Sequence, residues 1–203
     1  MDKYKKFIKF SIAIFSAAGV ILLLGPRTWF PGFYNPRFMG SLAFISIFII
    51  LLLAIILKAD SKKKQKALLE FQSAVTSTLL LSGAGGLGLY RLYLIGFQYD
   101  KVIHFLIAYI TTIALIDFIQ KWYDVNLKKS IILTCVIVAL LGLFWEITEF
   151  LTDVMFGVHT FGIYGKYVVW DTFMDIMMNF LGLFLGVISV GGQKKIKDKL
   201  ISS

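Results

Sequence analysis

Six apolar runs of about 20 residues each are the feature that most constrains this chain. A helix needs about 20 apolar residues to cross the ~30 Å hydrocarbon layer of a bilayer, and its backbone amides must be hydrogen-bonded within the segment. Of the 203 residues, 58% are hydrophobic and 16% are charged, which is more apolar than a soluble domain. We therefore predict an all-α, polytopic membrane protein, one integral membrane domain over 1–203, with spans at about 7–25, 38–57, 73–95, 102–119, 130–151 and 172–190.

The positive charges predict how these spans are oriented. The chain carries 21 Lys and Arg residues, and sixteen of them fall at alternate ends of the six runs, which places them on one side of the membrane. Positive loops stay in the cytoplasm. We expect a multi-pass protein of the plasma (inner) membrane with both termini cytoplasmic. The net charge of +9 lies in short clusters beside apolar runs, which favours a membrane surface over nucleic acid as the partner.

A glycine-rich stretch in the third run, SGAGGLG, fits the G-x-G-x-x-G pattern at Gly83, Gly85 and Gly88. A dinucleotide-binding loop needs a strand before this pattern and a helix after it. Here the surroundings are one apolar run, so we interpret the glycines as small residues that let neighbouring helices approach closely.

Acidic residues gather at one end of the last three spans. Six of the twelve acidic residues fall at the predicted outer ends of spans four, five and six: Asp100, Glu146, Glu149, Asp153, Asp171 and Asp175. An ionised group in hydrocarbon is costly and normally faces a protein interior or a water-filled cavity. The spacing lets them meet, because three sets each lie on one helix face: Asp100 with His104, Glu146 with Glu149 and Asp153, and Asp171 with Asp175 and Asn179.

So many carboxylates close together need compensation, since like charges in a poorly solvated site raise each other's pKa. Lys101, Lys166 and the two histidines, His104 and His159, are the nearby basic groups. A divalent metal ion held by carboxylates and an imidazole is the economical solution, with Zn, Mn, Mg or Fe as the candidates. We predict Asp100, His104, Glu149 and Asp175 as ligands, Glu146 and Asp171 as catalytic groups, and Asp153, Asn179 and His159 as further pocket residues.

Several of these residues also have a plain structural explanation, and Glu149 and Asp153 could be ordinary interfacial residues. Asp100 and Asp171 stand where they would stabilise the start of a helix. His104 is at a position suited to helix packing, and His159 lies in a glycine-containing loop. The functional interpretation rests on the fact that the three sets of polar residues are expected at the same depth in the membrane and near the same side of it.

The stretches YDKVIHF (99–105), WEITEF (145–150) and WDTFMDIMMNFLGLFLG (170–186) resemble those of the YjdF-like family of inner-membrane proteins. They match its D-x-x-x-H, E-x-x-E and W-D-x-x-x-D patterns, in order, over roughly 90–190. The chain is more distantly similar to VanZ-like proteins, but Glu149 replaces a glutamine and an arginine expected near Val169 is missing. The resemblance implies a membrane protein and little about activity.

Three functions are compatible with this pocket. The first is a metal-dependent hydrolase or transferase acting on a lipid or lipid-linked envelope substrate, in which the metal polarises a phosphoryl or acyl oxygen and a carboxylate acts as general base. The second is a cation- or proton-coupled transporter, although the spans offer few polar groups below Asn179. The third is a non-catalytic protein that binds a lipid headgroup or an envelope precursor. Oligomeric state is left open.

Overall fold

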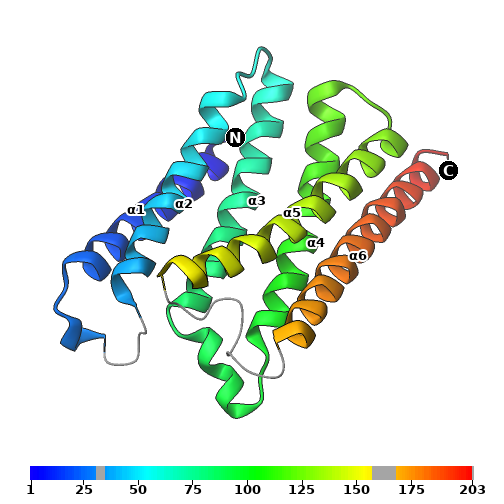
Figure 1. The fold of residues 1–203 in the computed structure, drawn as a ribbon. Coiled ribbons are helices and arrows are strands. Elements are labelled where there is room, and N and C mark those ends of the chain that lie inside the picture. The colour runs from blue at the N-terminus through cyan, green and yellow to red at the C-terminus, as the bar shows by residue number, and fades with distance from the viewer. Residues whose placement is uncertain (31–34, 157–167, 203) are drawn as a thin grey trace. The chain divides into compact units, whose positions relative to one another are not determined.

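The computed structural model describes residues 1–30, 35–156 and 168–202, with side chains up to residue 192. In these ranges the chain consists of helices joined by short connections, without a strand, which confirms the all-α fold class (Figure 1). The elements in chain order are α1 (Asp2–Leu24), η1 (Arg27–Trp29), α2 (Pro36–Ile56), α3 (Lys62–Gly86), η2 (Leu89–Ile95), α4 (Tyr99–Tyr123), α5 (Leu127–Phe156) and α6 (Val168–Ser202).

Five helices are long and apolar enough to cross a membrane: α1, α2, α4, α5 and α6. The pair α3 and η2 passes the same test only if it is taken as one bent span, so the described chain has five spans, or six with the bent pair. This confirms a multi-pass membrane protein. The predicted orientation of the termini stays a prediction.

The third predicted span, 73–95, is not one straight helix. α3 begins at Lys62, where the Ser61 hydroxyl accepts a hydrogen bond from the Lys64 amide (3.3 Å), and ends at Gly86. η2 then continues at 51° to it. The break contains Gly88, whose φ of 133° is strained for a residue with a side chain. Gly85 does support close packing, because a Cβ there would lie 2.6 Å from the Tyr90 ring.

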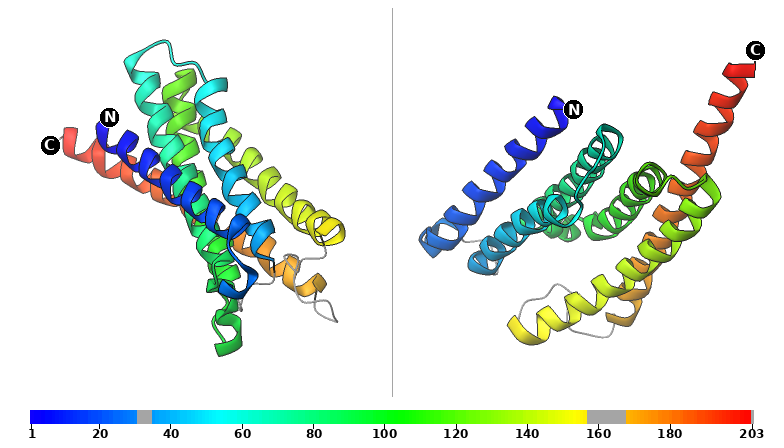
Figure 2. Two further views of the ribbon diagram at one scale, coloured as in Figure 1. Left: turned by 90° about the vertical axis from the view of Figure 1, so that its left-hand side faces the viewer. Right: turned by 90° about the horizontal axis from the view of Figure 1, so that it is seen from above.

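The described chain forms two units, Met1–Asp100 and Lys101–Ser203. In the first, α1, α2 and α3 pack on one another (Figure 2). Their core includes Ile8, Phe15, Ala43 and Ile50. The buried Gln72 side chain of α3 donates a hydrogen bond to the Ile50 carbonyl of α2 (2.7 Å), which satisfies a polar group inside an apolar core. The prediction of a single domain stays a prediction.

The second unit contains α5, α6 and nearly all of α4. A connection of three residues between α4 and α5 reverses the direction of the chain. Asp124 in this connection has a φ of 54°, and the side-chain oxygen of Asn126 accepts a hydrogen bond from the Lys129 amide (2.9 Å) at the start of α5. α6 lies close against α4 through two glycines one turn apart. A Cβ at Gly182 would collide with the Phe105 carbonyl, and one at Gly186 would lie 2.8 Å from Thr112. This close approach brings the polar residues of the two helices together.

Candidate functional site

Three buried polar side chains from three helices meet in the second unit. His104 comes from α4, Glu146 from α5 and Asp175 from α6. They expose only 5%, 5% and 3% of their surface. Because all three helices are long and apolar enough to span a membrane, these groups face the helix bundle instead of lipid, as ionisable residues in membranes do.

The imidazole of His104 stands between two carboxylates. Its Nδ1 lies 3.8 Å from Glu146 Oε1, and its Nε2 lies 3.6 Å from Asp175 Oδ1. A neutral imidazole has one N–H and one lone pair. One ionised carboxylate would therefore face a lone pair, and a proton or a metal ion at that place removes the repulsion.

Glu149 joins this arrangement one turn after Glu146 on α5. One ligand atom each from His104, Glu146 and Glu149 lie within 4.8 Å of one another. The Glu149 carboxylate also accepts a hydrogen bond from the Trp145 indole (2.8 Å). Two ligands that each lie about 2.1 Å from one zinc ion are at most about 4.2 Å apart, so the 3.8 Å between His104 Nδ1 and Glu146 Oε1 suits two ligands of one ion.

A second cluster lies beside the first and contains its own cation. Lys101 Nζ lies 2.5 Å from Asp171 Oδ1 and 2.7 Å from Asp175 Oδ2. The side chain of Lys101 is 12% exposed. Asp175 therefore faces an ammonium group on one side and His104 on the other. The Asp171–Lys101–Asp175 set holds two carboxylates and one ammonium group, so it keeps one negative charge when all three side chains are ionised. Lys101 neutralises Asp175 only in part.

The remaining predicted residues take different places. Asn179 joins the site, with its Nδ2 lying 3.3 Å from His104 Nδ1. Asp100 lies one turn before His104 on α4, its carboxylate within 4.8 Å of that imidazole. Asp153 is buried on α5, two turns beyond Glu146 and outside the group formed with His104 and Glu149. His159 lies outside the described residues, so nothing is said of its structure.

The role of Lys101 is the main feature that the sequence analysis did not assign. A signal for it was present, because Lys101 precedes His104 by three residues and so shares a helix face with it. Trp145 carried a similar signal, since it precedes Glu149 by four residues on α5. Both residues hold a carboxylate in place and belong to the site for that reason.

Chemically, the site offers one imidazole and two glutamates that suit a divalent metal ion, flanked by two aspartates that share the ammonium group of Lys101. A histidine with carboxylates suits Zn, Mn or Fe better than Ca. The same groups can also hold protons.

A family model described as "Predicted membrane protein (DUF2238)" matches residues 8–195. This is the YjdF-like family, so that resemblance is confirmed, and the match extends over the first two spans, where the three motifs have no counterpart. The likeness to VanZ-like proteins stays a prediction. No curated protein and no solved structure matches the chain.

Proposed function

This chain belongs to the DUF2238 family of predicted membrane proteins, and from the buried cluster around His104 we propose that it binds a divalent metal ion and uses it to hydrolyse or transfer a group on a lipid or lipid-linked envelope substrate. The observation that carries the proposal is the position of His104 between two carboxylates from two other helices. A metal ion at that place would relieve the repulsion between a carboxylate and the imidazole lone pair, and the ammonium group of Lys101 lies instead at Asp171 and Asp175.

The proposed ligands are His104, Glu146 and Glu149, whose ligand atoms lie within 4.8 Å of one another; Asp100, His104 and Asp175 form a second group of the same size. Asp100 and Asp175 flank His104 and are candidates to complete the coordination. A metal ion bound by such a set would act as a Lewis acid on a phosphoryl or acyl oxygen. A carboxylate of the cluster that does not hold the ion would serve as general base.

The class of substrate follows from where the site lies. All of its residues are on helices that are long and apolar enough to cross a membrane, near the ends that we predict to face outward. Side chains close to it on the outside of α5, such as Phe144 and Ile147, are apolar and more than half exposed. A substrate that reaches the cluster from the bilayer is therefore a lipid or is attached to one.

Elemental analysis tests the metal directly. We expect the full chain, purified in detergent without chelators, to hold about one divalent ion, as a site with a histidine and two carboxylates does. His104→Ala and Glu146→Gln should lose that ion, whereas Asp153→Asn, which changes a buried carboxylate on the same helix outside the group, should retain it. A metal content near zero in the wild type, or one that His104→Ala leaves unchanged, contradicts the proposal.

Proton or cation transport is a second candidate, favoured by one observation. Deeper in the unit, the Tyr109 hydroxyl of α4 and the Ser189 hydroxyl of α6 lie 3.1 Å apart, which adds a polar contact below Asn179. Lipid analysis of a strain without the protein separates the two functions. An accumulating phospholipid or carrier-lipid species supports chemistry, and an ion-sensitive growth defect without such a species supports transport.

A further inference from the structure

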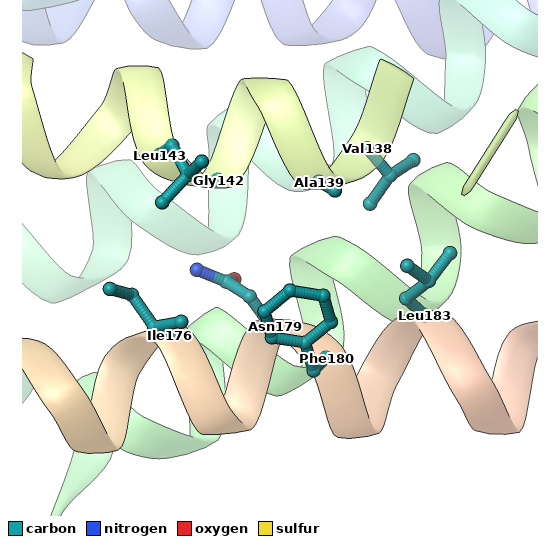
Figure 3. A pocket seen from close by; sticks show the side chains of 8 residues that line it. All are labelled: Val138, Ala139, Gly142, Leu143, Ile176, Asn179, Phe180 and Leu183. Atoms are coloured by element: carbon teal, nitrogen blue, oxygen red, sulfur yellow. The ribbon is translucent and has the colours of Figure 1, made fainter. Parts of the chain in front are cut away.

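The space between α5 and α6 beside Asn179 is too small for a ligand. It amounts to about 10 Å³, which is room for about one water molecule, and the side chains around it are otherwise apolar (Figure 3). A concentration of positive charge at one end of the first unit is a larger feature of the molecule, and it lies on the surface.

Lysines from α1, from the connection between α2 and α3 and from α3 gather at this end. Figure 1 shows the N-terminus and that connection at the same end of the first unit. The Tyr4 hydroxyl of α1 donates a hydrogen bond to Glu70 Oε1 of α3 (3.3 Å), which joins the two helices there. We call this surface the basic end and define it by the nine lysines of residues 3–9 and 58–66.

The acidic residues at the basic end offset only part of its charge. Three of them, Asp2, Asp60 and Glu70, stand against the nine lysines, which leaves a net charge of +6. Asp60 accepts a hydrogen bond from Lys64 (2.7 Å), and Glu70 lies 3.9 Å from the ammonium group of Lys66. Every lysine of the basic end except Lys64 is exposed, so a negatively charged partner can reach them.

Helix stability does not account for the lysines of α3. The first turn of this helix holds Lys62, Lys63 and Lys64 and no acidic residue. The N-terminal end of a helix carries a partial positive charge, so cations are unfavourable there and anions are favourable. A negatively charged partner beside this turn therefore stabilises it.

The apolar border of the basic end indicates which kind of anion binds there. Phe10 of α1 directly follows one lysine, and Ile55 and Ile56 of α2 precede another by two or three residues. These three side chains are 65%, 65% and 66% exposed. A soluble polyanion such as nucleic acid would contact the lysines and leave these side chains in water. A phospholipid matches both parts, because its phosphate contacts the lysines and its acyl chains cover the apolar side chains.

We infer that the basic end binds anionic phospholipids of the leaflet in which it lies. The negative surface potential of such a leaflet attracts lysines that stand immediately beside a membrane-spanning helix. The lysines of residues 3–9 and 58 stand beside α1 and α2, which are long and apolar enough to span. The inference does not rest on the proposed metal site, because its residues belong to the first unit and the proposed ligands of the ion belong to the second.

The test uses the full chain, purified in detergent and freed of lipid. The protein is incubated with equal amounts of phosphatidylglycerol and phosphatidylcholine that carry the same acyl chains, and native mass spectrometry counts the bound lipids of each kind. In detergent, the result does not depend on how the protein is oriented in a membrane. Each lysine near an anionic headgroup contributes about a fivefold factor in affinity. We expect the wild type to prefer phosphatidylglycerol about tenfold or more, and the preference to weaken as salt is raised.

Three pairs of substitutions locate the binding. Lys5→Gln with Lys62→Gln removes one exposed lysine from each helix and should weaken phosphatidylglycerol binding about tenfold. Lys5→Arg with Lys62→Arg keeps the charge and should retain the preference. Lys128→Gln with Lys129→Gln removes the same charge from exposed positions at the start of α5, in the other unit, and should leave the preference unchanged.

Three outcomes would overturn the inference. The first is equal binding of the two lipids by the wild type. The second is an equal loss of phosphatidylglycerol binding in both glutamine pairs, which would show an effect of net charge alone. The third is displacement of phosphatidylglycerol by a short single-stranded RNA that binds the same lysines more tightly. His104→Ala should keep the lipid preference whether or not it loses metal, so the proposed metal site and the basic end succeed or fail separately.

Discussion

Lys101 Nζ lies 2.8 Å and 2.7 Å from the two carboxylate oxygens of Asp175, so one ammonium group faces both oxygens of a side chain that is 4% exposed. The same nitrogen contacts Asp171 one turn earlier on α6. The contact joins the first turn of α4 to α6 inside the second unit. It also keeps Asp175 in place beside His104, because a carboxylate fixed by two hydrogen bonds has little freedom to turn.

Lys101→Met should therefore destabilise the protein. The substitution leaves two carboxylates near each other without their cation, and removal of one partner from a buried ion pair costs about 3 kcal/mol or more. We expect a lower melting temperature in detergent for Lys101→Met, and a partial recovery in Lys101→Met combined with Asp175→Asn. Equal melting temperatures for wild type and Lys101→Met would show that this ion pair contributes little.

The two glycines of α6 lead to a prediction about packing. A Cβ at Gly186 would lie 2.8 Å from Thr112, which is buried and cannot move aside easily. Overpacking of this kind costs about 1–3 kcal/mol. We expect Gly186→Val to lower the melting temperature and to weaken metal binding, because α6 carries Asp175 and Asn179 toward His104. Gly191→Val, at a position of α6 where a Cβ meets nothing within 4 Å, is the matched control.

The helices and the meeting of the polar stripes follow from sequence because they depend on local rules. Apolar length predicted α1, α2, α4, α5 and α6, and the i, i+4 spacing predicted that Asp175 and Asn179 share a face. Several helices are longer than the predicted spans, because turns with capping or charged residues continue the helix beyond its apolar part. The bend after Gly86 could not be predicted from hydropathy, since Gly88 and η2 are as apolar as a continuous span.

The partners of individual charges were harder to predict. The number of carboxylates in the sequence indicates a missing cation, but it does not show that Lys101 supplies one cation to both Asp171 and Asp175. Which lysine rotamer reaches which carboxylate depends on the distance between α4 and α6, and this distance is set by Gly182 and Gly186. A pattern of residue types contains no such distance.

Trp145 allows a test of how Glu149 is held. The indole N–H donates to Glu149 Oε1 at 2.8 Å, and groups that orient metal ligands typically change metal affinity about 10–100-fold. We expect Trp145→Phe to weaken the metal affinity within that range, measured by competition with a chromophoric chelator, while the protein stays folded. Trp170→Phe removes an exposed indole that stacks on Phe173 and should leave the affinity unchanged. If both variants bind metal with the affinity of the wild type, the hydrogen bond from Trp145 does not orient Glu149 as a metal ligand.

The last prediction concerns the side of the membrane on which the site opens. The charge distribution predicts that the connection between α2 and α3 lies inside the cell, and that η1 and the start of α4 lie outside. Thr28, Ala59 and Gln98 are exposed positions in these three segments, and Cys135 is the one cysteine of the chain. In a Cys135→Ser background, a membrane-impermeant maleimide added to intact cells should label Thr28→Cys and Gln98→Cys and should label Ala59→Cys only after the cells are opened. Labelling of Ala59→Cys but not of Gln98→Cys in intact cells would show that the His104 cluster lies near the cytoplasmic side of the membrane. A substrate in the outer leaflet would then be excluded.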